Sequence, residues 1–537
     1  MRTFLSSLII ALATLGPVLA LEPVAVVSVA SVERVLEDVD QISEYGERPA
    51  LARFVRSLVS IANELKGVDR ETPLRLEFLL PEEPGPQPQF RLIIPITSEE
   101  QVRETISRVG LELFESGDHL RLRKRGGTGE KNPLVVFRDG CLIISPEAEA
   151  LTPTLLPVPR EQQSDITFRI EARHIPGRLK QALLDKLHTD VARDRSRNTG
   201  GSESERAVRM EILALAERSI ELAVEETQSI EISADLMPAR EQGDGPGVAI
   251  SAQWNTVSGG TLSRQLQYLK ADQRFFAVSS DPQAAASLHV CGSIPPRVQP
   301  LLEMGIAAGR RAVRDELEKA TDRQRAAVMG VLDVISRTFE EQHAEFLIEF
   351  LPANERMVLV AGAHAAEGNE SAEALKVLLP EVEKSNEVDS IQMGVASVNG
   401  VEFHRLQGTH LKPSDERLYG PKTSAYLGAG STDLWIVLGE PAALDILPYC
   451  VGSRPRDSGS GELAHLNVHV RPWLHFVGDN AKERQIVDAL RQNFPENTAD
   501  SLNAVVTVED NGLAAQIELD RPFLKLLATL IAARAGR

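Results

Sequence analysis

The chain has 537 residues and a net charge of −19, with 42% apolar and 25% charged residues. These proportions are ordinary for a globular protein and exclude wholesale disorder, and at about 150 residues per domain the length predicts three or four domains. Because the excess negative charge repels phosphate backbones and anionic headgroups, we expect neither nucleic acid nor an acidic membrane as a partner.

Residues 1–20 have the pattern of a cleavable secretory signal peptide. Arg2 precedes an uncharged apolar run over residues 4–19, and small residues stand at the positions that signal peptidase recognises before the cut after Ala20. The run is interrupted by a Gly-Pro pair and is short for a spanning helix, which needs about 20 apolar residues. We therefore expect cleavage, export to the periplasm or the extracellular space, and no integral membrane segment in the mature chain.

After the leader, an apolar or alternating segment runs directly into a helix-like segment four times, at residues 24–39, 165–184, 287–302 and 463–477. An amphipathic helix follows the first opening, because Leu51, Phe54, Val55 and Leu58 recur at the spacing that places them on one helical face. A longer amphipathic segment, 313–339, follows the third. Self-similarity of this kind indicates a repeated unit.

Strand pairs come next in each unit, at residues 74–96, 228–254, 344–365 and 501–519. In the first pair Arg75 and Glu77 alternate with Leu74, Leu76 and Phe78. Strict alternation is typical of an antiparallel sheet with one solvated face, so we expect the polar side chains of each hairpin to be wet.

Three units close with a strand that leads into a proline-started helical turn, at residues 139–151, 272–288 and 432–447. The sequence therefore predicts an α+β protein of tandem repeated units, three full units plus a half unit, each an antiparallel sheet with helices mainly on one face. The predicted boundaries are 21–157, 165–286 and 287–451 for the α+β units and 462–537 for the C-terminal half unit.

No motif in the sequence names a reaction. The Gly-rich segment 126–131 lacks the spacing of a phosphate-binding loop, and neither a nucleophile elbow nor a zinc-protease motif occurs in the sequence. A glycosidase with two catalytic carboxylates stays open among 77 acidic residues, but aromatic residues, which line sugar clefts, make up only 4% of the chain. We therefore predict no catalytic residue and no cofactor.

The best metal-ligand candidates are His465, His469 and His475, with His404 and His410 as additions. His465 and His469 would face the same side of a strand, but at about 3.3 Å per residue they stand about 13 Å apart, beyond the reach of one zinc ion. The preferred interpretation is ordinary surface or partly buried histidines, and thus no metal site.

Cysteines are few for an exported chain, at positions 141, 291 and 450. Cys141 and Cys291 lie inside apolar, strand-like runs, where an unpaired cysteine usually acts as a small buried hydrophobe. We expect both to be core residues.

The signal peptide, the repeated layout of strand, helix and hairpin, and the closing segment 432–447 resemble a class of large exported bacterial proteins of unknown function with repeated α+β units. The resemblance transfers no site residue. Our first hypothesis is an exported, non-catalytic repeat protein whose acidic surface binds a partner protein or an envelope component, because stacked units build extended binding surfaces. The alternative is a secreted hydrolase with an active site between two units.

Overall fold

A computed structural model describes most of the chain, which divides into two units. The first consists of Met1–Leu187, Ala223–Val257 and Glu518–Arg537, and the second of His188–Leu222 and Ser258–Ile517. The structure describes residues 22–45, 49–80, 89–117, 119–127, 132–151, 164–197, 203–236, 247–271, 275–276, 284–316, 321–353, 355–382, 388–408, 412–451, 461–476, 488, 490–492, 494 and 499–524. The predicted signal peptide, 1–20, lies outside the described residues.

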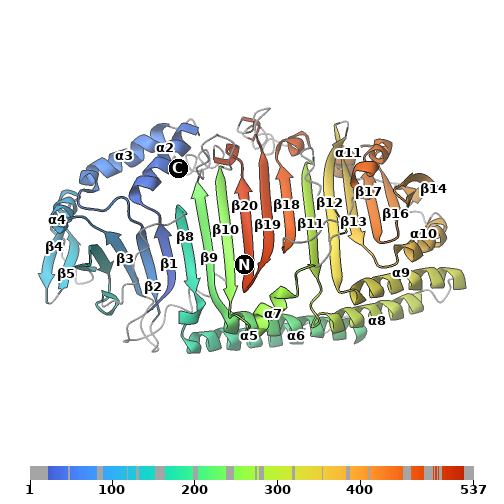
Figure 1. Ribbon diagram of the computed structural model, residues 1–537, viewed down its shortest axis with the longest axis horizontal. Coiled ribbons are helices and arrows are strands. Elements are labelled where there is room, and N and C mark those ends of the chain that lie inside the picture. The colour runs from blue at the N-terminus through green and yellow to red at the C-terminus, as the bar shows by residue number, and fades with distance from the viewer. Residues whose placement is uncertain are drawn as a thin grey trace. The chain divides into compact units, whose positions relative to one another are not determined.

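The first unit is built on an antiparallel sheet (Figure 1). Its described strands are β1 (Pro23–Val29), β2 (Leu74–Leu79), β3 (Gln89–Pro95), β4 (Leu111–Ser116), β5 (His119–Lys124), β6 (Leu134–Arg138), β7 (Cys141–Ser145), β8 (Ile166–Glu171), β9 (Thr227–Leu236) and β10 (Val248–Thr256). Its helices are α2 (Val32–Tyr45), α3 (Pro49–Ile61) and α4 (Glu99–Arg108), with short 3₁₀ turns η1 (Asn63–Leu65), η2 (Glu149–Leu151) and η3 (Ala172–His174). Two long helices, α5 (Gly177–Arg197) and α6 (Glu203–Glu226), join β8 to β9.

The second unit holds another large sheet. Its described strands are β11 (Ala286–Ser293), β12 (His343–Ala353), β13 (Arg356–His364), β14 (Val388–Val398), β15 (Val401–Gly408), β16 (Ser424–Ala429), β17 (Asp433–Gly439), β18 (Glu462–His469), β19 (Ser501–Glu509) and most of β20 (Gly512–Leu519). Its helices are α7 (Thr261–Gln267), α8 (Gln299–Glu316), α9 (Asp322–Glu340), α10 (Gly368–Val382), α11 (Pro413–Tyr419) and α12 (Leu447–Cys450), with 3₁₀ turns η4 (Pro441–Asp445) and η5 (Arg471–His475). Among the described residues, no helix is both long enough and apolar enough to cross a bilayer.

The two sheets are threaded in the same order. In the first unit the neighbouring strands run β10, β9, β8, β1, β2, β3, β7, β6, β5, β4. In the second unit they run β20, β19, β18, β11, β12, β13, β17, β16, β15, β14, which is the same order with each number raised by ten. The helices recur too, since a helix pair follows the first strand of each set and a single helix the third. The described part of the chain thus contains the same ten-strand pattern twice.

This pattern differs from the predicted three full units and a half. Within its described residues, the predicted unit 165–286 contributes only three strands before β11, against seven for the unit before it. Its expected closing strand, within 272–288, lies largely outside the described residues. The long amphipathic segment 313–339 is not one helix either. Helix α9 begins at Asp322, and the side chain of Thr321 forms a capping box with Gln324 at its N-terminus.

The buried face of the first sheet carries charge. Arg75, Glu77 and Arg91 are 7%, 1% and 2% exposed. Glu77 accepts from Arg75 at 2.9 Å and from Arg91 at 2.5 Å, and Arg91 also donates to the backbone oxygen of Ala150 in η2 at 3.4 Å. The prediction that these polar side chains are the wet ones is wrong, because they pair with one another beneath the segment that follows β7.

The opposite face is apolar and only half-buried. In the second unit Val290, Phe346, Ala363 and Leu434 are cross-strand neighbours on four adjacent strands, so they lie in one row. We call the apolar face of this unit the set Leu502, Ala504, Val506, Ala464, Leu466, Val468, Ala286, Leu288, Val290, Phe346, Ile348, Phe350, Leu359, Ala361, Ala363, Leu434, Ile436, Leu438, Ala425, Leu427 and Ala429. Phe346 and Ile436 are 38% and 48% exposed, whereas Ala429, at the end of β16, is buried at 4%.

The main core lies behind this face. Trp435, Tyr426 and Phe403 are at most 2% exposed and pack with Leu347, Val360 and other buried side chains. The turn η4 and helix α12 close over them with Ala443 and Leu447. Trp435 is therefore a core residue.

Candidate functional site

A pocket of about 360 Å³ lies at the end of β18, where the chain turns into η5. Its described lining is Ala284, Pro352, His469, Arg471, Pro472, His475 and Asp500. Two of the histidines considered in the sequence analysis, His469 and His475, therefore share one cavity. The remaining one, His465, is not in this lining and hydrogen-bonds through Nε2 to Asn503 at 2.7 Å.

Asp500 organises the pocket. Its carboxylate accepts from His469 Nδ1 at 3.0 Å, from the backbone N–H of Arg471 at 2.7 Å and from Arg471 Nη2 at 3.3 Å. Burial, to 2% exposure, would by itself raise the pKa of this carboxyl, but the hydrogen bonds from His469 and Arg471 outweigh burial and hold the pKa below its ordinary value. The carboxylate is therefore ionised at neutral pH.

The arrangement can support acid–base chemistry. When His469 donates its Nδ1 proton to Asp500, its Nε2 atom is left as an acceptor, as in a catalytic carboxylate–histidine pair. In the structure this Nε2 atom lies 3.4 Å from the side-chain amide nitrogen of Asn467, a contact that a water molecule would have to replace. Among the described lining residues there is no serine, threonine or cysteine.

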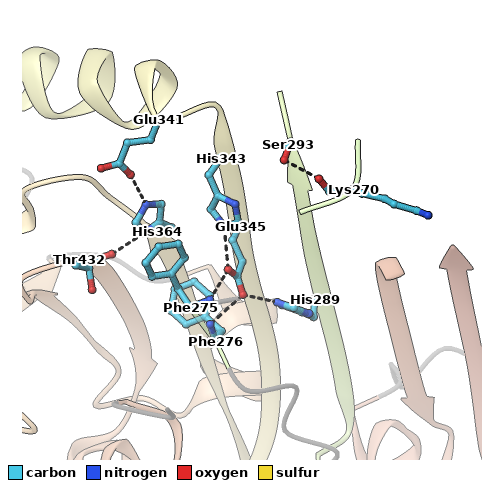
Figure 2. Close-up of polar contacts among 10 residues, drawn as sticks. All are labelled: Lys270, Phe275, Phe276, His289, Ser293, Glu341, His343, Glu345, His364 and Thr432. Atoms are coloured by element: carbon cyan, nitrogen blue, oxygen red, sulfur yellow. Dashed lines mark hydrogen bonds and ion pairs between the residues drawn. The ribbon is translucent and has the colours of Figure 1, made fainter. Parts of the chain in front are cut away.

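A second polar cluster lies on the buried face of β11 and β12 (Figure 2). His289 and Cys291 are two apart on β11, and His343 and Glu345 are two apart on β12, so each pair projects from one face of its strand. Cys291 pairs with Glu345 in the strand register, which places all four side chains on the same face. His289, Cys291 and Glu345 are 2%, 1% and 3% exposed.

Glu345 is the centre of this cluster. Its carboxylate accepts from the backbone N–H groups of Phe275 and Phe276 at 2.6 and 2.9 Å, and it bonds to His289 Nε2 at 2.8 Å and His343 Nε2 at 3.1 Å. Burial would raise the pKa of the carboxyl, but the four hydrogen bonds prevail and lower the pKa to about 2. The site is thus a fixed negative charge surrounded by imidazoles.

Aromatic contacts complete the cluster. The ring of Phe275 stacks on His364 with centroids 3.7 Å apart and meets the edge of His343 at 5.0 Å. His364 is held in turn between the backbone oxygen of Thr432 and the carboxylate of Glu341, each at 2.9 Å. Figure 2 shows His289, His343 and the backbone of Phe275 and Phe276 meeting at Glu345, while His364 lies on the outer side of the Phe275 ring.

Sequence reasoning missed this cluster. Cys291 was expected to be a buried hydrophobe, and its burial is confirmed, as is that of Cys141. The signal that could have revealed the site is the pair of i, i+2 patterns, His289 with Cys291 and His343 with Glu345, in strands that are otherwise apolar. Of the added candidates, His404 is buried and its Nδ1 accepts from the backbone N–H of Gly394, and His410 lies outside the described residues.

Comparison of the chain with protein families, with curated proteins and with solved structures found no match.

Proposed function

We propose that the protein is an exported, non-catalytic repeat protein that binds a protein partner in the cell envelope, and that the contact surface is the apolar face. One observation supports this proposal. The charged side chains of the sheet lie on its buried face, while the apolar side chains lie on the face that is half-exposed. The expected acidic surface supplies solubility in this proposal, and the apolar face supplies the contact.

The size of the apolar face is sufficient for a binding surface. It covers three rows of side chains on seven neighbouring strands. With strands about 4.8 Å apart and about 6.8 Å between rows, these side chains span roughly 400 Å². Contiguous apolar patches of a few hundred Å² or more on soluble proteins mark interaction sites, whereas scattered apolar residues do not.

The first unit has a face of the same kind. Ile166 and Ile232 are 44% and 42% exposed, and Phe168 pairs with Ile232 in the register of β8 and β9. Phe90, which is 45% exposed, pairs with Phe78 on β2. A surface retained in both copies of the ten-strand pattern supports a shared binding role.

The test measures whether the apolar face captures an apolar probe. The mature chain is titrated with a dye that fluoresces on apolar protein surfaces, and the variants Phe346→Lys and Ile436→Lys are compared with Val382→Lys. Val382 is 39% exposed at the end of α10 and lies outside the apolar face, so it is a control of matched exposure. We expect the two face variants to lose dye fluorescence and the control to keep it.

An equal signal from all four proteins, or none from the unaltered chain, would refute the proposed contact surface. The same variants then serve as baits: a partner from the envelope must bind the unaltered chain and the Val382→Lys control and fail to bind the face variants. A partner that binds all of them equally would place the contact elsewhere.

The pocket around Asp500 favours a second candidate function, a secreted hydrolase. The ionised carboxylate orients His469 so that its Nε2 atom can accept a proton from water. The measurement is hydrolysis of ester, peptide, phosphate and glycoside substrates by the mature chain. His469→Asn would abolish turnover, whereas His465→Asn, on the same strand but outside the described lining, would retain it. Absence of turnover in the unaltered chain removes this candidate.

A further inference from the structure

We propose that Cys291, His343 and Glu345 bind a zinc ion. The thiol sulfur, an imidazole nitrogen and a carboxylate oxygen of these residues all lie within 4.8 Å of one another. They come from neighbouring strands in register, since Cys291 stands opposite Glu345 and Ser293 opposite His343. The proposal is independent of the apolar face, which lies on the other side of the sheet.

The distances fit a shared ion. His343 Nε2 and the Glu345 oxygen are 3.1 Å apart. Two tetrahedral ligands at zinc bond lengths of 2.0 to 2.1 Å are separated by about 3.3 Å. An ion can therefore replace the hydrogen bond between these atoms with a shift of a few tenths of an ångström, while Cys291 supplies a third ligand.

The donor set selects the metal. A thiolate, an imidazole and a carboxylate together are typical of zinc, and the soft sulfur disfavours magnesium and calcium, which prefer oxygen ligands. Three protein ligands leave one tetrahedral position for water or another small ligand.

The surroundings hold the ligands in place. The backbone N–H groups of Phe275 and Phe276 and the ring of His289 bond to the Glu345 carboxylate, so this ligand is already oriented and ionised. Outer partners of this kind fix the geometry of metal ligands. His343, the first residue of β12 and 9% exposed, is the most accessible of the three ligands.

Zinc binding must release a proton. The Cys291 thiol gives up its S–H proton to solvent, so the affinity for zinc rises with pH. The neutral His343 ring keeps its proton but carries it on Nδ1 instead of Nε2, which frees Nε2 to bind the ion.

A competing cluster is less suited. His188 lies near Glu217 and Glu221 on the facing helices α5 and α6, with donor atoms also within 4.8 Å of one another. The Arg195 guanidinium, however, already bonds to Glu217 at 2.7 Å, and the His188 side chain is 46% exposed. A cation there would have to compete with the Arg195 guanidinium for the Glu217 carboxylate.

The experiment uses the mature chain stripped of metal with a chelator. Zn²⁺ is titrated in competition with a chromophoric indicator, and Co²⁺ is titrated in parallel because a thiolate ligand gives an intense charge-transfer absorption. Cys291→Ser and His343→Gln are the test variants. Cys141→Ser is the matched control, since Cys141 is the other described buried cysteine and lies on β7 outside either cluster of metal donors.

We expect one tightly bound Zn²⁺ per chain and a thiolate band with Co²⁺. Each test variant should lose more than about 100-fold in zinc affinity, because removal of an outer partner alone costs about 10- to 100-fold. The Cys141→Ser control should keep the affinity. If a test variant does not fold, the thiolate band of the unaltered chain with Co²⁺ tests the proposal by itself. No binding, no thiolate band, or unchanged affinity in folded Cys291→Ser would overturn the proposal.

Discussion

Replacement of Glu345 by glutamine should strongly destabilise the second unit at neutral pH. The carboxyl is buried to 3% exposure and its pKa is lowered from 4.5 to about 2. A depression of about 2.5 units is worth roughly 3 kcal/mol of folding free energy at 1.36 kcal/mol per unit. Because the pKa is lowered on folding, this contribution is complete above the ordinary pKa and disappears as the pH falls from about 4.5 to 2.

The assay is urea unfolding with a chelator present, at pH 7 and at pH 3. It is followed by tryptophan fluorescence, to which Trp435 and Trp473 contribute from the second unit and Trp254 from the first. Glu345→Gln should lose roughly 3 kcal/mol against the unaltered chain at pH 7, and the difference should shrink by about 2 kcal/mol at pH 3. The exposed strand residue Glu115 supplies the control, Glu115→Gln, which should change little at either pH. A variant as stable as the unaltered chain at pH 7, or a difference independent of pH, would refute the reasoning.

Two further predictions concern the first unit, each checked by urea unfolding. Arg91→Met leaves the buried carboxylate of Glu77 short of a partner and should cost about 3 to 5 kcal/mol. Arg108→Met breaks an exposed ion pair with Glu104 and should cost under about 1 kcal/mol. Burial, and next the charge of Asp165, raise the pKa of Asp38 to about 7. Since this pKa is raised on folding, Asp38 costs stability as the pH rises from about 4 to 7. Asp38→Asn should therefore stabilise by up to roughly 4 kcal/mol at pH 8 and by little at pH 4, whereas equal effects at both pH values would contradict this assignment.

The sequence by itself determined the elements and their local pairing. The four expected hairpins form, as β2 with β3, β9 with β10, β12 with β13 and β19 with β20. The helix expected around Leu58 is α3. These features depend on periodicity and on contacts between segments close in the chain, which the order of residues records directly.

Only the tertiary structure decided which face of each sheet is buried. Alternation at Arg75 and Glu77 shows that two faces differ, but it does not show which one is covered. That depends on a distant segment, since the oxygen of Ala150 reaches Arg91, and the amide groups of Phe275 and Phe276 reach Glu345. The buried charged groups are tolerated because these partners form hydrogen bonds with them. The alternation of residue types along a strand does not reveal such partners.

The candidate sites were decided in the same way. His343 and Glu345 lie on a strand more than fifty residues from Cys291, and Asp500 lies thirty-one residues from His469. The pairing of β11 with β12, and of β18 with β19, brings these groups together. The metal-binding and hydrogen-bonding residues of each strand can be read from the sequence. The register between strands joined by long connections, however, is set by packing of the whole unit. That register brings the residues of each site together.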